Sequence, residues 1–445
     1  MYMNIKKIIK RIMPTCLHRL RHLFLAWRGA VKYGHPSREL IVIGITGTSG
    51  KSTTVSLLRQ LLEHAGYRVG SLSTIDFSIA GENKLNDQKM TMLGKSQIQK
   101  YLREMVDANC DIAIVETTSE GRLQHRHKFI AYDMISLTNL YPEHIDSHGS
   151  FEKYKQAKLD IFHYISKLKI KKIKGKEIKK VVSVHGNTKE APKFLEEIFA
   201  EKYAFGREDA EVFTALVDAD TLLAKDVSVK KDGLHFSVGK YTFHAPMYGE
   251  HNVSNIMGVI SFARVLGIDW KVIKAGVAEF RGVPGRVEFI PEAEEKGFQV
   301  IVDYAFEPGA IGALYEVVDL LKPARVIHVF GSTGGGRDLS RRESVGTFVG
   351  EHADICIVTD EDPYEDDPME IIKDVAEAVK GTGKKEDKDL FLILDRGEAI
   401  SRAIKLAKKG DLVLVTGKGS EQAMCVKGEL VSWDDREEVK KALKK

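Results

Sequence analysis

The chain has 445 residues, more than one hydrophobic core usually organises, so we expect two or three domains. Its 67 basic and 63 acidic side chains nearly balance, which argues against a nucleic-acid partner and leaves small charged substrates open. The four cysteines lie far apart without a CxxC pair, so their spacing suggests neither a zinc site nor a disulfide framework and fits a reducing compartment.

Residues 1–39 form a basic, amphipathic N-terminal segment. Lysine and arginine alternate with Ile, Leu, Phe and Trp27, and the only acid is Glu39. No apolar run is long enough to span a bilayer and no cleavage site follows one, so we expect a cytoplasmic protein without a signal peptide. Residues 1–35 fit two arrangements: a helix lying on an anionic membrane, or a helix packed on the next domain.

Residues 40–287 repeat a pattern of apolar strand, polar turn and helix. The first strand, at residues 40–45, leads into a glycine-rich turn, and a helix with regular apolar spacing follows at residues 53–65. Buried strands are expected at residues 112–115 and 134–137, each ending in polar residues. Such strands form a parallel sheet that carries its chemistry at the carboxyl ends of the strands.

The lysine-rich stretch at residues 167–180 reads as an exposed helix or loop. After residue 287 a second alternation begins, with strands expected at residues 300–302, 325–330, 355–358 and 412–415. The sequence therefore predicts an α/β protein. It has a P-loop-type doubly wound central ATPase domain at residues 40–287 and a Rossmann-like C-terminal α/β domain at residues 288–445.

The turn after the first strand has a phosphate-binding pattern, formed by Gly47, Thr48, Ser49, Gly50, Lys51, Ser52 and Thr53. Backbone N–H groups of such a turn can surround phosphate oxygens, a lysine reaches the terminal phosphates, and the next hydroxyl ligates Mg²⁺. Five residues separate Gly44 from Gly50, one more than the strict P-loop pattern has. A tight structural turn is the alternative interpretation.

Several segments, in the same order along the chain, resemble the Mur ligase family, which builds the peptide stem of bacterial cell walls. They are the turn at residues 46–52, residues 138–149, the surroundings of Lys158, and residues 251–255, 282–286, 302–305, 395–396 and 417–421. Within the family the resemblance is greatest to members that add the third stem residue. It implies an ADP-forming ligase that uses ATP and Mg²⁺ to join an amino acid to a muramoyl-peptide acceptor through an acyl-phosphate.

The resemblance also implies a metal-binding and catalytic set, Lys51, Glu116, His144 and Lys158. Ser52 and Glu116 would hold one Mg²⁺, and Glu116, His144 and a carbamylated Lys158 would hold a second. A free lysine ammonium repels a metal ion, whereas its CO₂ adduct is an anionic oxygen ligand. Taken singly, His144 fits a core histidine and Lys158 a solvated lysine, so only their joint spacing favours the metal set.

The remaining site residues are assigned by the same resemblance. The nucleotide would contact the glycine-rich turn together with Asn252, Asn255, Arg286 and Asp303. The acceptor would contact Thr117, Thr118 and Ser119, and the amino acid would contact Arg337, Asp362, Tyr364, Gly417 and Glu421. Because Arg286 lies at the expected domain junction, it could sense closure of the C-terminal domain over ATP.

Two departures from the family pattern concern the substrates. Family members carry an N-terminal domain that grips the uridine nucleotide, but only about forty residues precede the first strand here. The acceptor is therefore left open between UDP-N-acetylmuramoyl-dipeptide and a lipid-linked or folate-type acceptor. A catalytically inactive nucleotide-binding subunit is a third interpretation.

Selection of the amino acid also differs. Members that add diaminopimelate carry Asp-Asn-Pro-Arg where this chain has Glu361-Asp362-Pro363-Tyr364. The arginine is lost and acids cluster at residues 361–367, so we expect a cationic amino acid such as lysine. The same acids also fit a solvated loop. We expect a monomer whose other partners are small molecules.

Overall fold

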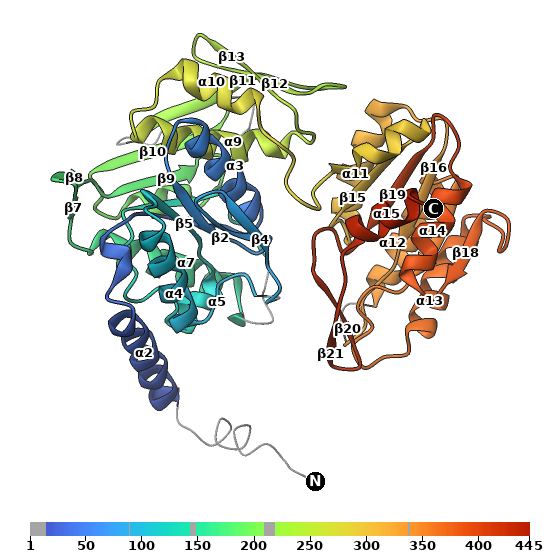
Figure 1. Cartoon of the computed structure of the whole chain (residues 1–445), viewed down its shortest axis with the longest axis horizontal. Coiled ribbons are helices and arrows are strands. Elements are labelled where there is room, and N and C mark those ends of the chain that lie inside the picture. The colour runs from blue at the N-terminus through green and yellow to red at the C-terminus, as the bar shows by residue number, and fades with distance from the viewer. Residues whose placement is uncertain (1–14, 89, 143–147, 209–218, 337–338) are drawn as a thin grey trace.

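The computed structural model describes residues 15–88, 90–142, 148–208, 219–336 and 339–445, and it consists of two lobes that each contain one large sheet (Figure 1). His144 and Arg337 lie outside the described residues. No helix in the described ranges has the length and apolar content needed to cross a bilayer.

The N-terminal lobe contains an eleven-stranded sheet within the described residues. Its strands are β1 (Ile41–Thr46), β2 (Val69–Leu72), β3 (Asp76–Ile79), β4 (Glu82–Leu85), β5 (Ile112–Glu116), β6 (Met134–Leu137), β9 (Val181–His185), β10 (Glu201–Arg207), β11 (Asp220–Lys230), β12 (Gly233–Val238) and β13 (Tyr241–Ala245). Their order is β13-β12-β11-β10-β9-β6-β1-β5-β2-β3-β4. The strands from β11 to β2 pair in parallel, and antiparallel hairpins extend both ends of the sheet.

Helices cover both faces of this sheet. On one face lie α3 (Lys51–His64), α9 (His251–Val265) and α10 (Trp270–Ala278), and on the other lie α4 (Lys95–Asp107), α7 (Phe151–Ser166) and α8 (Ala191–Leu195). Successive residues of β1 point to opposite faces: Ile43 belongs to the first core and Val42 to the second. The lobe is therefore doubly wound, as predicted. The short helix α5 (Ser119–Leu123) contacts α7.

The C-terminal lobe repeats this plan on a smaller sheet. Its strands are β14 (Glu288–Phe289), β15 (Gln299–Asp303), β16 (Val326–Phe330), β17 (Ile355–Thr359), β18 (Leu390–Ile393) and β19 (Leu412–Thr416), in the order β14-β15-β19-β16-β17-β18. All pairs are parallel except β14 with β15. One face packs against α11 (Pro308–Leu321), α12 (Ser340–His352) and α13 (Pro368–Gly381), the other against η2 (Pro291–Lys296), α14 (Arg396–Leu406) and α15 (Asp435–Leu443). The hairpin β20 (Ala423–Val426) and β21 (Glu429–Ser432) lies beside the sheet.

The predicted strands and the helix after the glycine-rich turn are confirmed, with ends that differ by one or two residues. The lysine-rich stretch is different from the expectation. It forms the hairpin β7 (Lys171–Ile173) and β8 (Lys176–Ile178), and two of its lysines are buried. Lys171 Nζ lies 2.6 Å from Asp133 Oδ2, and Lys180 Nζ lies 3.2 Å from Asp133 Oδ1. The expectation of full exposure was wrong because the buried Asp133 carboxylate requires a counter-charge.

Before α3, the chain forms α2 (Thr15–Lys32) and the short helix η1 (Pro36–Arg38). α2 extends from the N-terminal lobe and contacts α4 (Figure 1). Ala26 and Ala30 are buried, and a side chain at Gly29 would meet the backbone of Ser96 at 2.9 Å. Small residues thus let this face of α2 approach the lobe closely.

The parallel arrangement determines where the polar residues meet. β1 pairs with β5 so that Ile45 lies opposite Glu116, and with β6 so that Thr46 lies opposite Leu137. The carboxyl ends of these three strands therefore share one edge of the sheet, and the glycine-rich turn leaves from the middle strand.

Candidate active site

The glycine-rich turn is held open by side chains from the end of β6. Asn139 Oδ1 accepts hydrogen bonds from the N–H of Thr48 at 3.0 Å and of Ser49 at 2.9 Å. Thr138 Oγ1 donates to the carbonyl of Ser49 at 2.6 Å. Gly50, with φ 73°, precedes α3, and a Cβ there would clash with Asn255. The turn thus needs glycine at residue 50, both for its left-handed backbone and for space.

Lys51, Ser52 and Glu116 form the centre of the site. Lys51 Nζ donates to the carbonyl of Thr48 at 2.8 Å, within the turn. Ser52 Oγ donates to Glu116 Oε2 at 2.9 Å, and the same carboxylate oxygen accepts from the Thr74 N–H at 2.7 Å. A hydroxyl and a buried carboxylate therefore converge from α3 and β5. These oxygens are ligands of the kind that Mg²⁺ prefers, so the donor set fits this ion.

Lys158 lies directly beneath the turn. It is on α7, it is buried, and its Nζ donates to the carbonyl of Gly47 at 2.7 Å. The same Nζ is 4.6 Å from the centre of the Tyr154 ring, whose hydroxyl donates to Thr48 Oγ1 at 3.1 Å. The interpretation of Lys158 as a solvated lysine is therefore wrong, since the helix places it against the glycine-rich turn.

Two cavities meet at Lys51. The larger, of about 900 Å³, is lined by residues 48–53, Glu116, Asn252, Asn255, Arg286 and Asp303. The smaller, of about 240 Å³, is lined by Gly47, Thr118, Ser119, Arg126, Tyr154 and Lys158. Lys51 and Thr91 line both cavities. A group bound in the smaller cavity would thus face a phosphate chain in the larger one across the Lys51 ammonium.

The predicted acceptor residues separate in the structure. Thr118 and Ser119 line the smaller cavity. Thr117 is fully buried beneath it and lines neither cavity; its hydroxyl lies 3.1 Å from the Val115 carbonyl and 3.0 Å from the Tyr132 hydroxyl. Thr117 therefore supports the strand end rather than presenting a hydroxyl to a ligand.

Two asparagines at the start of α9 connect the turn to the cleft. Asn255 Nδ2 donates to Asn252 Oδ1 at 2.9 Å, and Thr54 Oγ1 donates to Asn255 Oδ1 at 3.4 Å. Asn252 Nδ2 donates to the carbonyl of Tyr248 at 2.7 Å. Tyr248 also lines the larger cleft, although the sequence analysis did not identify it.

Asp303 of the C-terminal lobe and Arg286 of the segment that joins the lobes also line this cleft. Asp303 Oδ2 accepts from the Val287 N–H and Oδ1 from the Ala305 N–H, both at 2.6 Å. Burial raises the pKa of Asp303, and the positive charge of Arg286 opposes this rise. The Arg286 guanidinium lies 4.3 Å from the centre of the Tyr304 ring. The segment that joins the lobes is thus held against the carboxyl end of β15.

A buried lysine organises the predicted amino-acid residues. Lys418 Nζ forms an ion pair with Asp362 Oδ2 at 2.8 Å and a second with Glu421. Asp362 Oδ1 also accepts from the Cys425 N–H at 2.6 Å, and Tyr304 donates its hydroxyl to Glu421 at 3.2 Å. The protein itself therefore supplies a counter-charge to Asp362 and Glu421. Lys418 was missed as a site residue, although it follows the polar end of β19.

Other acids of residues 361–367 have local structural partners. Asp366 accepts from the Gly335 N–H at 2.9 Å, and Asp367 caps α13 by accepting from the Met369 N–H at 2.8 Å. These hydrogen bonds of Asp366 and Asp367 therefore stabilise the local fold of this segment. The Tyr364 side chain packs on Gly335, and the backbone of Tyr364 is left-handed, with φ 54°.

Glu361 differs from Asp362, Asp366 and Asp367. It is buried, a Cβ added at Gly417 would clash with it, and Oε2 accepts no hydrogen bond within the described residues. Burial raises the pKa of Glu361 to about 7, and the charges of Arg396 and Lys418 oppose that rise. Among the described residues, Oε2 of this buried carboxyl therefore has no hydrogen-bond donor.

The sequence matches two domains of one family. Residues 45–263 match the Mur ligase middle domain, and residues 285–419 match the Mur ligase glutamate ligase domain.

Known relatives show the same likeness over most of the chain. The UDP-N-acetylmuramyl-tripeptide synthetase of Roseiflexus sp. is 33% identical over 426 residues, covering 94% of this chain and 81% of that protein. The UDP-N-acetylmuramoyl-L-alanyl-D-glutamate–2,6-diaminopimelate ligase of Clostridium tetani is 32% identical over 417 residues, covering 92% and 79%.

Solved structures agree on the fold. A UDP-N-acetylmuramoyl-L-alanyl-D-glutamate–2,6-diaminopimelate ligase superposes with a TM-score of 0.59 at 25% identity, covering 91% of this chain and 78% of that one. The folylpolyglutamate synthase of Mycobacterium tuberculosis, from crystal structures of complexes with ADP and AMPPCP, superposes with a TM-score of 0.65 at 17% identity. It covers 91% of this chain and 96% of the synthase, and at that identity the likeness concerns the fold alone.

Proposed function

Because the chain belongs to the Mur ligase family, whose members are ATP-dependent, ADP-forming ligases, we propose that it adds an amino acid to a UDP-N-acetylmuramoyl-peptide during peptidoglycan precursor synthesis. The amino acid would be the third stem residue. The observation that carries the proposal is the position of Lys51 between two cavities, one spanning both lobes and one beside Lys158.

The two cavities support distinct roles for the two substrates. ATP binds in the larger cleft with its phosphates on residues 48–53, and the acceptor carboxylate enters the smaller cavity near Thr118 and Ser119. An acceptor oxygen attacks the γ-phosphorus and ADP leaves, giving an acyl-phosphate. The amino group of the incoming residue then attacks the acyl carbon, loses a proton, and phosphate leaves. Lys51 neutralises the charge of the transferred phosphoryl group, and the cleft aligns the reactants.

The same geometry supports a proposal for the metal ligands. Ser52 and Glu116 would hold one Mg²⁺, which supplies charge neutralisation at the phosphates. We propose that Lys158 is carbamylated and joins Glu116 and His144 around a second ion. The burial of Lys158 beside the turn supports this role, since an anionic carbamate at that place could face a cation.

Carbamylation can be tested apart from the overall reaction. Protein equilibrated with ¹³C-bicarbonate should show one carbamate carbon resonance that Lys158→Ala removes and Lys155→Ala keeps. Lys155 is a matched control because it is a buried lysine on the same helix that pairs with Glu190 at 3.2 Å. The same resonance in both variants would contradict the assignment.

The ligase activity itself is tested by phosphate release. Purified protein is given ATP, Mg²⁺, UDP-N-acetylmuramoyl-dipeptide and each candidate amino acid in turn, and release should require both acceptor and amino acid. Full turnover by Lys51→Ala would overturn the catalytic scheme. Release with a folate or a lipid-linked acceptor instead would show that a protein of this fold uses another class of acceptor.

For the amino acid, we propose a cationic side chain such as lysine, with Glu361 as its recognition carboxylate. We propose Glu361 rather than the whole acidic cluster, because Asp362, Asp366 and Asp367 already bind protein groups. Lysine should then be preferred over diaminopimelate, and Glu361→Gln should raise the KM for lysine more than it lowers kcat. A clear preference for diaminopimelate would contradict the proposal.

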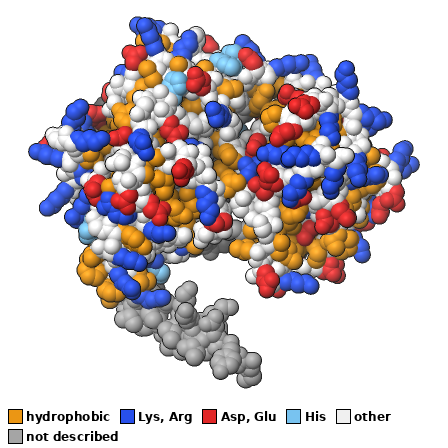
Figure 2. All heavy atoms as spheres, viewed as in Figure 1, with side chains coloured by type: hydrophobic (Ala, Val, Ile, Leu, Met, Phe, Trp, Pro, Cys, Tyr) orange, Lys and Arg blue, Asp and Glu red, His pale blue; other side chains and the backbone are white. Residues whose placement is uncertain are grey.

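We further propose that α2 attaches the protein to an anionic membrane surface and that the chain is otherwise monomeric. Leu20, Phe24 and Trp27 are 62%, 55% and 46% exposed, although they are large and apolar. With Leu23 and Val31 they recur at helical spacing along α2, next to the face that carries the buried Ala26 and Ala30. Figure 2 shows hydrophobic side chains beside Lys and Arg side chains at the lower left of the molecule, where Figure 1 places α2. Apolar and basic groups on one helix suit binding to anionic lipid.

Co-sedimentation with vesicles tests this attachment. The protein should bind vesicles that contain phosphatidylglycerol and bind pure phosphatidylcholine vesicles much less, while Phe24→Glu combined with Trp27→Glu should abolish binding. Ile198→Glu is the matched control, since Ile198 is 86% exposed in the same lobe but outside α2. If light scattering instead shows a dimer that the α2 variant dissociates, the helix covers a second copy rather than a membrane.

A further inference from the structure

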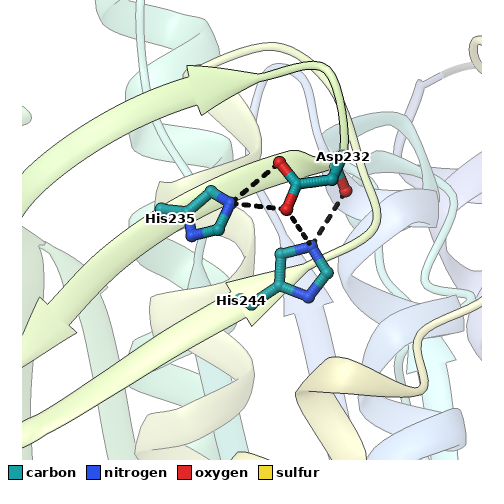
Figure 3. A group of neighbouring side chains, drawn as sticks. All are labelled: Asp232, His235 and His244. Carbon is teal, nitrogen blue, oxygen red and sulfur yellow. Dashed lines mark hydrogen bonds and ion pairs between the residues drawn. The ribbon is translucent and has the colours of Figure 1, made fainter.

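A cluster of two histidines and an aspartate lies at the β13 end of the large sheet, outside both cavities (Figure 3). Asp232 occupies the turn between β11 and β12, His235 is on β12 and His244 is on β13. His235 and His244 are direct partners in the antiparallel register of these two strands. Their side chains therefore leave the same face of the sheet, one beside the other.

The potential ligand atoms converge on a small volume. His235 Nε2 lies 3.0 Å from Asp232 Oδ1 and 3.1 Å from Oδ2. His244 Nε2 lies 3.6 Å from Asp232 Oδ2 and 2.9 Å from the Asp232 carbonyl. One ligand atom from each side chain lies within 4.8 Å of the other two. Figure 3 shows both imidazole rings directing a nitrogen at the carboxylate.

The backbone that carries these residues is well anchored. Gly233 lies so close to the backbone of Ala245, Pro246 and Met247 that a Cβ there would clash with it. Tyr248 donates its hydroxyl to the carbonyl of Lys231 at 2.7 Å, next to Asp232. The turn is thus packed against the end of β13, and the three side chains are placed before any ion arrives.

We propose that Asp232, His235 and His244 form a binding site for a divalent transition-metal ion, Zn²⁺ or a similar ion. Two imidazoles and one carboxylate are ligands that zinc favours, whereas Mg²⁺ prefers oxygen ligands. The cluster is partly exposed, so water can complete the coordination. This site is chemically distinct from the Ser52 and Glu116 pair, and it involves no cysteine.

The alternative is an ordinary surface ion pair, in which Asp232 only neutralises a protonated histidine. The two arrangements differ in a measurable way. A metal site needs both histidines neutral and at the same time bound to one ion, so binding saturates at one ion per chain and requires each of them. An ion pair gives no saturable metal binding.

Cobalt absorption and zinc calorimetry on the full chain test the proposal. The metal-free protein, with excess Mg²⁺ present to occupy the oxygen sites, is titrated first with Co²⁺ and then with Zn²⁺. One ion per chain should bind, with visible d–d absorption for Co²⁺. His235→Gln and His244→Gln should each weaken binding by at least roughly 100-fold, because mutation of an outer-shell partner alone costs about 10- to 100-fold.

His163→Gln is the matched control, because His163 is also an exposed histidine paired with a carboxylate, Glu197, at 2.8 Å. It should retain wild-type metal affinity. Thermal unfolding without metal should be alike in all three variants, which separates loss of the site from loss of the fold. The proposal is overturned if no saturable Co²⁺ spectrum appears, or if His235→Gln and His163→Gln bind the ions equally well.

Discussion

Lys51 is the residue on which the proposed chemistry depends most directly. Lys51 lines both cavities, and in the proposed reaction its ammonium meets the charge of the transferred phosphoryl group. Lys51→Ala should lower amino-acid-dependent ADP release by about 100- to 1,000-fold, the usual loss when a transition-state charge partner is removed. Lys100→Ala, which removes an exposed lysine paired with Glu104, should leave the rate unchanged.

Glu361 should make stability depend on pH. Its carboxyl has a pKa raised from 4.5 to about 7 in the folded chain. Between these pH values the unfolded chain loses this proton while the folded chain keeps it. The contribution of Glu361 to the free energy of unfolding should therefore fall as the pH rises. The loss amounts to at most about 3 kcal/mol.

The measurement is the free energy of unfolding across this pH range for the wild type and for Glu361→Gln. The difference between the two free energies of unfolding should depend on pH, since glutamine does not titrate. Parallel curves for the two proteins would mean that Glu361 is already ionised in the folded state.

At the scale of elements, the β7–β8 hairpin shows where composition misleads. A stretch rich in lysine suggests exposure, yet Lys171 and Lys180 turn inward to the fully buried Asp133 at the start of β6. Burial lowers the pKa of Lys171 to about 8, although the Asp133 charge opposes this. Nothing in the local pattern distinguishes these two lysines from their exposed neighbours, because their partner lies about forty residues away.

Asp133→Asn should therefore destabilise the protein by about 3–5 kcal/mol, because it leaves two buried lysines without their counter-charge. Glu177→Gln in the same hairpin is the control. Glu177 pairs with Lys172 at 3.4 Å and both are exposed, so its loss should cost less than about 1 kcal/mol. Chemical denaturation of the three proteins measures both values, and equal midpoints would show that the buried pairs contribute nothing.

At the scale of the whole molecule, the larger cleft is lined by residues of both lobes, from the turn after β1 to the end of β15. A ligand that contacts both sides favours the closer arrangement of the lobes. A non-hydrolysable ATP analogue with Mg²⁺ should therefore lower the radius of gyration in small-angle X-ray scattering. Arg286→Ala should reduce that change at saturating nucleotide, since Arg286 links the junction to Tyr304. An unchanged radius for the fully bound wild type would contradict closure.

The sequence by itself determined the doubly wound α/β class, the strands that carry the site and the phosphate-binding turn. These are local properties: apolar runs of strand length, helical spacing and a glycine-lysine turn each occupy a few consecutive residues. The family resemblance added which distant residues share the nucleotide cleft, and Asn252, Asn255, Arg286 and Asp303 do line it with the turn.

Only the tertiary structure decided how charges pair. In the folded chain Lys158 is buried against the glycine-rich turn, and Lys418 forms ion pairs with Asp362 and Glu421. Glu361 forms no ion pair among the described residues, and His235 lies beside His244. Each of these outcomes depends on which charged groups the sheets bring together after burial. The cost of burying a charge is met by partners that are distant in sequence, so no local pattern contains that information.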